Sequence, residues 1–381
     1  MTKRKQHVSG DNSLFDQISV DLVINILSKL PVKSIAQCRC VSKHWSSIIR
    51  RPNYNMLFPT KSPATPRFLF IVENGLFGRK LFISSSPQPQ NPDEHSSLEA
   101  TLHTSFAPTD YCIICPPVNG LVCRYLRGKD CIFAVISNPI TGEYVTTPKV
   151  KTEDYPSKEK MYFGYDPVEE QFKVLFMTWL PSSGSHEYQV LTLGTRNLSW
   201  RKIQCCVLHY PHEDDGICIN GVLYYQAIID QKRSIVCFDV RSEKFSFVNI
   251  DQYLATRIRE PLILIDYKGS KLGAIHCHIE SNFFNLWVLE NAEEHKWSDN
   301  FYKMPEVLRP SRIESLFSAG MIGSGEVVLY GKNARIFVYI LYYNLEKNII
   351  TSVSFLVPGL DYVEYHGVHT FPNFVGDVKL M

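Results

Sequence analysis

The sequence predicts a small all-α unit of three helices followed by an all-β, propeller-like body of about six short antiparallel units. Three observations lead to this fold class. Apolar residues recur at helical spacing only near the N-terminus, short strand-like runs fill the chain from Phe68 onward, and one hairpin pattern recurs in a fixed register. A β-sandwich body is the alternative, because short antiparallel strands joined by turns also build that fold.

The first helix is expected to begin after Ser19, a good N-cap, and to end before Pro31, which cannot continue a helix. Its apolar residues fall at i, i+1, i+4, i+5 and i+8, which predicts a single wide apolar stripe. The residues of this stripe are Leu22, Val23, Ile26, Leu27 and Leu30.

Two further short helices are expected before Pro52. The second carries Ile35 and Cys38. The third places four apolar residues at i, i+4, i+7 and i+8, namely Val41, Trp45, Ile48 and Ile49. A unit of only about 40 residues buries too little surface to be comfortably stable alone. We therefore expect part of its apolar surface to be covered by another protein.

The helical unit resembles an F-box, the short three-helix motif by which a substrate receptor binds the adaptor subunit of a cullin-RING ubiquitin ligase. The resemblance covers roughly residues 14–58 and is most specific between Leu30 and Trp45. It is carried by Asp21-Leu22-Val23, Ile26-Leu27, Leu30-Pro31-Val32-Lys33-Ser34-Ile35, Arg39-Cys40-Val41-Ser42-Lys43 and Trp45.

This resemblance implies a docking site for a Skp1-type adaptor and, through it, for a cullin-RING core. The adaptor-binding residues that we infer from it, some of which must instead form the small core, are Ile18, Leu22, Ile26, Leu27, Leu30, Pro31, Val32, Val41 and Trp45. The chain has Ile18-Ser19 where the family usually has Leu-Pro, and Asn25 where it usually has Glu. Ile18 keeps an apolar anchor and Ser19 keeps a helix start, so we expect adaptor binding to survive both changes.

Composition is that of a soluble globular protein: 381 residues, 45% hydrophobic and 20% charged. No apolar run reaches the ~18 residues of a membrane helix, and the N-terminus lacks the apolar core of a signal peptide. Eleven cysteines without a secretion signal favour free thiols in a reducing compartment. We therefore expect an intracellular protein of the nucleus, the cytoplasm or both.

Charge is distributed unevenly along the chain. Residues 1–67 carry eleven Lys and Arg against three Asp and Glu, a net charge of +8, whereas the remainder carries −6. A basic head suggests an acidic partner, which nucleic acid or an acidic adaptor surface would provide.

Four segments are expected. Residues 1–13 are polar and predict a disordered tail, and residues 14–58 hold the helical unit. Residues 59–67 contain three prolines and predict a stiff linker, after which the β body occupies residues 68–381. Within the body, residues 84–99 are polar and rich in serine and proline, and are expected to form an exposed loop.

A weak internal repeat decides the architecture of the body. Asn119-Gly120 and Asn220-Gly221 are each followed after 19 residues by Asn or Asp, and after 25 residues by Tyr or Phe. The end of this unit recurs alone between Asp166 and Phe172. The pattern predicts hairpins in which an Asp or Asn side chain caps a turn before an aromatic residue starts the return strand. The tail from Pro358 is expected to close the ring by pairing with the first strand.

The body resembles the plant F-box-associated domains, of the kelch-like type 3 class. The matching pieces are Ser137-Asn-Pro-Ile-Thr-Gly-Glu-Tyr-Val145, Tyr162-Phe-Gly-Tyr-Asp-Pro-Val-Glu-Glu-Gln-Phe-Lys-Val174, Gln189-Val-Leu-Thr-Leu-Gly194, Ser199-Trp-Arg-Lys-Ile203, Gly216-Ile-Cys-Ile-Asn-Gly-Val-Leu-Tyr-Tyr225, Ile235-Val-Cys-Phe-Asp-Val-Arg-Ser-Glu-Lys-Phe245 and Leu286-Trp-Val-Leu-Glu290. Together the two resemblances imply the substrate-recognition subunit of an SCF (Skp1-cullin-F-box) E3 ubiquitin ligase. The F-box would dock on the adaptor, and the β body would bind a target protein for ubiquitination. Such a subunit is a non-catalytic receptor.

No catalytic, cofactor-binding or metal-binding residues are predicted. His276-Cys277-His278 offers two imidazoles on one strand face, fewer ligands than zinc requires, and Cys112 and Cys115 have no second ligand pair. The polar cluster from His209 to Gly216 is expected to be a loop between blades.

Two other functions stay open from the sequence. A nucleic-acid-binding regulator with a basic three-helix head needs Arg, Lys, Asn or Gln on an exposed face of the third helix, where this chain has Val41, Trp45 and Ile48. A propeller enzyme needs converging carboxylates or metal ligands, for which the sequence offers no set to name. The target itself is not specified, and its choice is expected to depend on the loops 84–99, 181–187, 208–215 and 251–260.

Overall fold

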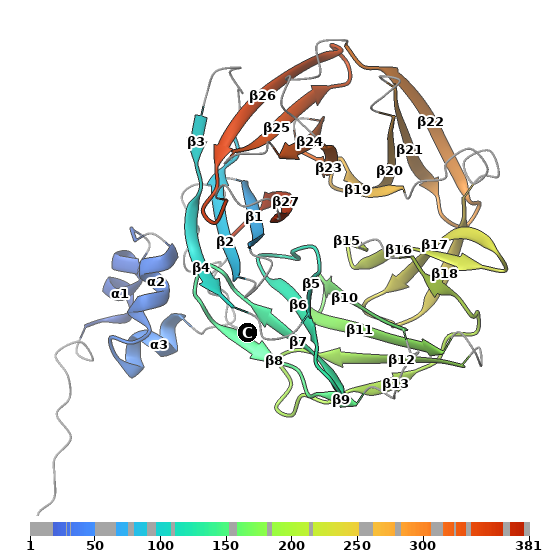
Figure 1. Cartoon of the computed structure of the whole chain (residues 1–381). Coiled ribbons are helices and arrows are strands. Elements are labelled where there is room, and N and C mark those ends of the chain that lie inside the picture. Colours follow the sequence, from blue (N-terminus) through green and yellow to red (C-terminus); the bar gives the residue numbers. More distant parts are fainter. Residues whose placement is uncertain are drawn as a thin grey trace, which may run out of the picture.

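The computed structural model of the chain shows a six-bladed β-propeller with a separate helical head (Figure 1). It describes residues 18–27, 29–30, 32–49, 66–74, 80–89, 97–107, 111–151, 158–180, 185–212, 216–250, 262–278, 283–305, 315–323, 325–332, 337–360 and 366–376. The predicted fold class is therefore confirmed, and the sandwich alternative is wrong, because the strands form six separate antiparallel sheets arranged in a ring.

The head, which we define as residues 18–49, contains three short helices. They are α1 (Val20–Leu27), α2 (Val32–Cys38) and α3 (Lys43–Ile49). The expected N-cap is present, since the Ser19 hydroxyl accepts a bond from the backbone N–H of Leu22 at 3.4 Å. None of the helices that the structure describes is long and apolar enough to cross a membrane.

Each blade is a sheet of four or five strands that follow one another from the propeller axis outward. Blade 1 holds β27 (His366–Phe374), β1 (Arg67–Asn74), β2 (Lys80–Pro87) and β4 (Thr101–Phe106). Blade 2 holds β5 (Tyr111–Ile114), β6 (Val122–Arg127), β7 (Cys131–Ser137) and β8 (Tyr144–Thr146), with β9 (Val150–Lys151) also paired to β7. Blade 3 holds β10 (Lys158–Asp166), β11 (Gln171–Leu180), β12 (Ser185–Thr192) and β13 (Arg201–Ile203).

The other three blades continue around the ring. Blade 4 holds β15 (Ile217–Ile219) and β14 (Tyr210–Pro211), both paired to β16 (Val222–Ile229), then β17 (Lys232–Asp239) and β18 (Phe245–Asn249). Blade 5 holds β19 (Ile263–Tyr267), β20 (Lys271–His278), β21 (Phe283–Asn291) and β22 (Lys296–Lys303). Blade 6 holds β23 (Ser315–Met321), β24 (Glu326–Lys332), β25 (Phe337–Asn344), β26 (Ile349–Leu356) and, on its outer edge, β3 (Ser97–Glu99).

The ring is closed at two places by strands from opposite ends of the chain. Near the axis β27 pairs antiparallel with β1, so that Val368 lies opposite Val72. At the rim β3 pairs parallel with β26, with Leu98 opposite Phe355. The expected pairing of the C-terminal tail with the first strand is thus confirmed, whereas the sequence pattern does not predict the pairing of β3.

The apolar core is divided among the six junctions between neighbouring blades. Each junction buries one cluster, such as Phe68, Phe70 and Phe355 between blades 1 and 6. Because both faces of every blade are covered in this way, the strands are apolar over most of their length rather than strictly alternating.

The predicted hairpin repeat is confirmed in its turns. Asn220 and Gly221 have φ values of 48° and 85°, the left-handed pair that a two-residue hairpin requires, and Asn119-Gly120 repeats them at 46° and 81°. A Cβ on Gly221 would also meet Pro167 at 3.0 Å. The carboxylate or amide oxygens of Asn138, Asp166 and Asp239 each accept a backbone N–H two or three residues ahead, at 2.9, 2.9 and 2.6 Å.

The expected loop 84–99 is wrong at both of its ends. Ser84, Ser85 and Ser86 are buried in β2, and residues 97–99 form β3; the stretch 90–96 lies outside the described residues. A serine run is typical of exposed loops, but Ser85 is small enough to be buried. Its hydroxyl accepts a bond from Arg67 Nε at 2.8 Å and lies 2.7 Å from His103 Nε2.

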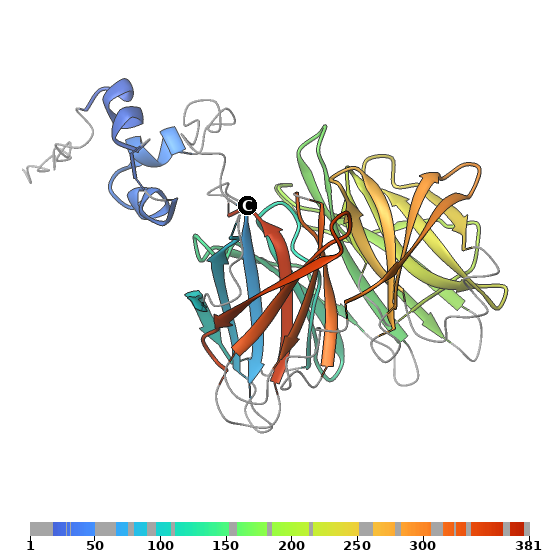
Figure 2. The ribbon, with the colours of Figure 1, turned by 90° about the horizontal axis from the view of Figure 1, so that it is seen from above.

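In blades 2 to 6, the turns between the first and second strands, and between the third and fourth, lie at the end of the propeller that also holds the head (Figure 2). We call this the head end. At the head end, Arg241 of blade 4 contacts Asp166 of blade 3, with Arg241 Nε 3.2 Å from Asp166 Oδ2. Nearby, Lys173 Nζ donates to Glu243 Oε1 at 2.7 Å and to the Arg241 carbonyl at 3.2 Å. These bonds join the two blades beyond their apolar contact.

A first prediction concerns ring closure. Ending the chain after Leu360 removes β27 and leaves β1 with an unpaired edge next to an open blade junction. We expect this truncated chain to lose its cooperative thermal transition and to self-associate in size-exclusion chromatography. Ending it after Gly376, beyond β27, is the matched control and should leave both properties unchanged; equal behaviour of the two truncations would contradict this role of β27.

A second prediction concerns pH. Burial raises the pKa of Asp166, but bonds from the backbone of Val168, from Arg241 and from the backbone of Glu169 outweigh it, so the pKa lies below its usual value. The ionised carboxylate therefore stabilises the fold above about pH 4, and this stabilisation is lost as the pH falls through the folded-state pKa. Asp166→Asn should lower the free energy of unfolding by roughly 1 kcal/mol at pH 7.

Urea denaturation at a series of pH values measures this effect. The difference between the wild-type protein and Asp166→Asn should shrink as the pH is lowered below about 4, since both side chains are then uncharged. Asp299→Asn, at an exposed position of β22, is the control and should change stability little. A difference for Asp166→Asn that does not depend on pH would show that the charge is not what stabilises the junction.

Candidate functional site

Helix α1 presents two apolar faces instead of the single stripe that its sequence predicted. Val23 and Leu27 are fully buried, whereas Leu22 is 52% exposed and Ile26 is 36% exposed. Each pair is separated by four residues, so the two pairs form parallel rows along the helix. One row packs inside the head, and the other row faces outward.

The inward row belongs to a small core that fixes the three helices. Its buried members are Val23, Leu27, Ile35, Trp45, Ile48 and Ile49. Ile18, Leu30 and Cys38 pack against this core and are partly buried. Of the predicted adaptor-binding residues, the structure therefore places Leu27 and Trp45 inside the core and Ile18 and Leu30 at its edge.

The exposed large apolar residues among the described part of the head are Leu22, Ile26 and Val41. We call these three residues the head patch. Pro31 lies outside the described residues, and Val32 begins α2 but its side chain is not described. Soluble proteins often expose single apolar side chains, but three in a unit of this size, two of them in one row, make this part of the head a candidate docking surface.

Val41 differs from its predicted place on the third helix. The Ser42 hydroxyl accepts a bond from the backbone N–H of Trp45 at 3.2 Å, so Ser42 is the N-cap and α3 begins at Lys43. Val41 lies in the turn before the cap and is 38% exposed. Sequence spacing alone placed Val41 among the apolar residues of the third helix, because the capping serine does not interrupt the i, i+4, i+7 spacing.

Within α3, as described from residue 43 to residue 49, Lys43 is the one Lys or Arg. The exposed positions of this helix are Lys43 and Ser47, and its apolar side chains are buried. A helix that reads DNA needs several polar or basic side chains on an exposed face. The described part of the head thus does not favour the nucleic-acid alternative.

One ion pair joins the head to the propeller. Arg39, which follows α2, has its Nη1 2.5 Å from Glu143 Oε1, in the turn between β7 and β8 of blade 2. The Arg39 side chain is 9% exposed and that of Glu143 is 37% exposed. The charge-assisted bond holds the head beside blade 2 at the head end.

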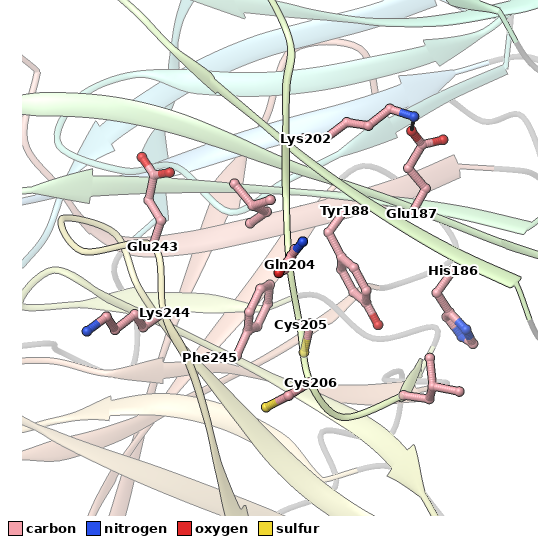
Figure 3. A pocket seen from close by; sticks show the side chains of 12 residues that line it. His186, Glu187, Tyr188, Lys202, Gln204, Cys205, Cys206, Glu243, Lys244 and Phe245 are labelled. Atoms are coloured by element: carbon pink, nitrogen blue, oxygen red, sulfur yellow. Dashed lines mark ion pairs between the residues drawn. The ribbon is translucent and has the colours of Figure 1, made fainter.

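A second candidate site is a pocket between the outer strands of blades 3 and 4, with a cavity volume of about 830 Å³ (Figure 3). Tyr188, Phe245 and Cys205 lie in its middle, and the ion pair of Lys202 with Glu187 lies to one side. Behind it is His209, which is fully buried. His209 Nε2 lies 2.8 Å from the Tyr225 hydroxyl, and its Nδ1 lies 3.0 Å from the Val207 carbonyl.

The electrostatics of this pocket do not suit catalysis. Burial lowers the pKa of His209 to about 4, so the ring is neutral at pH 7. Burial also raises the pKa of Tyr188 and of the Cys205 thiol, which keeps both groups protonated. Both ring nitrogens of His209 are already bonded within the protein. The network stabilises the junction of blades 3 and 4 rather than offering an ionised group to a substrate.

The predicted loop from His209 to Gly216 partly forms strand. Tyr210 and Pro211 are β14, which pairs with β16, and residues 213–215 lie outside the described part of the chain. His209 lies in the loop between β13 and β14, as predicted, but its side chain is buried in the core. The rings that pack on it, Tyr188, Phe245 and Phe247, come from distant parts of the sequence, so no local pattern signals this burial.

Metal-binding geometry is absent from the described residues, where no group of three or more His, Cys, Asp or Glu side chains is arranged to hold an ion. Cys112 and Cys115 form no disulfide and are buried among apolar residues of blade 2, and the side chains of Cys277 and His278 are not described.

These observations define a class of protein: a six-bladed β-propeller preceded by a small three-helix unit. Two family comparisons identify it further. The F-box domain family matches residues 15–56, and the family described as the F-box associated beta propeller domain matches residues 67–375. The chain therefore belongs to the F-box proteins that carry an F-box-associated β-propeller domain.

Whole-chain relatives agree with this assignment. The Arabidopsis thaliana chain At1g53550 is 51% identical, with 100% of both chains covered. F-box protein DOR from the same organism is 41% identical, again over 100% of both chains. F-box protein At3g61340, also from Arabidopsis thaliana, is 37% identical over 100% of this chain and 98% of that one.

A third prediction separates the two rows of α1. Leu27→Ala empties a fully buried position and should destabilise the head by about 2–5 kcal/mol. Leu22→Ala, one turn earlier on the exposed row, should change its stability by less than about 0.5 kcal/mol. Hydrogen exchange of the α1 amides in the full chain measures both effects. Equal loss of protection in the two variants would show that the outward row is part of the core.

Proposed function

We propose that this protein is the substrate-recognition subunit of an SCF-type E3 ubiquitin ligase, with the head docking on a Skp1-type adaptor and the propeller binding the target protein. The observation that carries the proposal is the head patch. Leu22, Ile26 and Val41 stay exposed although the head has its own packed core. Membership of the F-box family supplies the identity of the partner that would cover them.

This proposal divides the predicted site residues into direct adaptor contacts and residues of the head core. Leu22, Ile26 and Val41 would contact the adaptor directly. Leu27 and Trp45 would hold the helices in position from within the core, and Ile18 and Leu30 lie at the border of the two groups. Pro31 and Val32 remain predicted adaptor contacts. The surplus of positive charge in residues 1–67 suits an acidic adaptor surface.

The chain itself would perform no bond chemistry. It would hold a target protein near the ubiquitin-transferring subunits, which raises the effective concentration of the target's lysines at the transfer site. Such a role places the protein inside the cell, in the nucleus, the cytoplasm or both. The kelch-like character of the blades stays a prediction.

A fourth prediction tests adaptor binding. Leu22→Asp combined with Ile26→Asp places two charges on the head patch without entering the core, because both side chains are already exposed. Burying these two side chains on docking contributes about 3 kcal/mol or more, so the variant should bind a Skp1-type adaptor at least about a hundredfold more weakly. Co-purification and titration calorimetry with the full chain measure this loss.

The matched control is Val168→Asp on the propeller, where the valine is 67% exposed. It introduces the same kind of charge at another exposed apolar residue and should leave adaptor binding unchanged. If the wild-type chain fails to bind any Skp1-type adaptor under conditions where another F-box protein binds, the proposed function is wrong. If the double variant binds like the wild type, the adaptor contacts lie elsewhere on the head.

A further inference from the structure

A cavity of about 630 Å³ lies along the propeller axis, and neither the predicted site nor the family assignment accounts for it. It is lined by residues of blades 1, 2, 4, 5 and 6, from Leu262, just before β19, to the Asn119-Gly120 turn at the head end. This volume lies within the range of ordinary ligand pockets. The walls are mainly apolar and include Ile217, Leu264, Met321, Phe371 and Phe374.

One acidic side chain lines this cavity, together with His369. Among its lining residues, Asp266 of β19 is the one Asp, Glu, Lys or Arg. The Asp266 carboxylate accepts a bond from the backbone N–H of Gly269, but its Oδ1 is buried and has no hydrogen-bond partner among the described residues. Burial also raises the pKa of this carboxyl group, the opposite of what an ion pair would do.

A second polar group in the cavity is also unsatisfied. Thr370 of β27 is 3% exposed, and its hydroxyl oxygen is buried without a hydrogen-bond partner in the described part of the chain. Leaving a buried acceptor unpaired costs about 1–3 kcal/mol, and more for a charged one. Two such groups in the lining of one cavity favour an occupant that donates several hydrogen bonds and carries a positive charge.

The aromatic and sulfur-containing walls favour a guanidinium group over an ammonium group as the positively charged occupant. A guanidinium group is planar, donates five hydrogen bonds and packs its faces on aromatic rings, whereas an ammonium group is compact and strongly hydrated. Phe371, Phe374 and Tyr330 line the cavity with Asp266 and Thr370. An arginine side chain therefore matches both the walls and the unpaired acceptors.

The cavity continues into a second depression that leads outward. Asp266, Met321 and Asn373 line both, and the second depression, of about 690 Å³, extends over Tyr302, Leu345 and Glu346 between blades 5 and 6. The combined space exceeds what one side chain needs, so it also accommodates the peptide segment that carries the arginine.

We propose that the axial cavity is the recognition site for an arginine-containing segment of the target protein, with the guanidinium group bonded to Asp266 and reaching toward Thr370. This inference rests on the proposed function, since it assigns the target-binding surface of the same receptor. The segment would enter at the head end, the end at which Arg39 holds the head against Glu143.

Libraries of nine-residue peptides, with one fixed central residue and random neighbours, test the proposal in a fluorescence-polarisation assay on the full-length protein. The fixed residue is arginine, lysine or citrulline, which has the shape of arginine without its charge. We expect the arginine library to bind at least about tenfold more tightly than the citrulline library and more tightly than the lysine library. Equal binding of the arginine and citrulline libraries would overturn the proposal.

Substitutions at two cavity residues test whether these residues cause the preference for arginine. Asp266→Asn keeps the size of the side chain and should remove most of the preference for arginine over citrulline. Thr370→Val should weaken arginine binding by a few-fold. Asp299→Asn, an exposed carboxylate of the same blade, is the control and should preserve the preference. An Asp266→Asn protein that discriminates like the wild type would overturn the proposal.

Adaptor binding is measured on the same samples, so the two failures can be told apart. A protein that binds the adaptor but shows no preference for arginine retains the proposed function and loses only this inference. A protein that binds no Skp1-type adaptor loses the proposed function, whatever the peptides do. If N-acetyl-arginine amide alone binds as tightly as the peptides, the occupant is a free small molecule and the assignment to a target segment is wrong.

Discussion

The pairing of β27 with β1 is the interaction on which the rest of the propeller depends. Each blade buries its two faces against its two neighbours, so a ring with one open junction would expose two apolar faces at once. The same pairing builds the axial cavity, because β27 contributes Thr370, Phe371 and Phe374 to its wall. Stability of the ring and the shape of the candidate recognition site are therefore set by one strand.

The head is stabilised differently from the propeller. Six buried side chains hold its three helices, and the outward row of α1 is left without partners among the described residues. A unit this small gains little from burial, so covering Leu22 and Ile26 with an adaptor would add to its stability as well as to binding. The Arg39–Glu143 ion pair fixes the head beside blade 2.

Local chemistry explains which parts could be predicted from the sequence. The turns at Asn220-Gly221 and Asp239 are predictable, because they depend on a few neighbouring residues. The two rows of α1 were not separable, since Leu22 and Val23 are equally apolar and only the positions of α2 and α3 decide which faces inward. Asp266 and Thr370 line one cavity although they lie far apart in the sequence. The one local sign was an aspartate closing the apolar run Leu262–Ile265.

Closure by the last strand also orders events during synthesis. The head is complete once residue 49 has left the ribosome, whereas β1 waits for its partner until residue 374 has been made. At about 5–20 residues per second, this interval lasts some 15–65 seconds. If the proposed function holds, an adaptor would meet a folded head while the propeller behind it is still an open array of blades. The nascent chain would then bind the ligase before its propeller could bind a target.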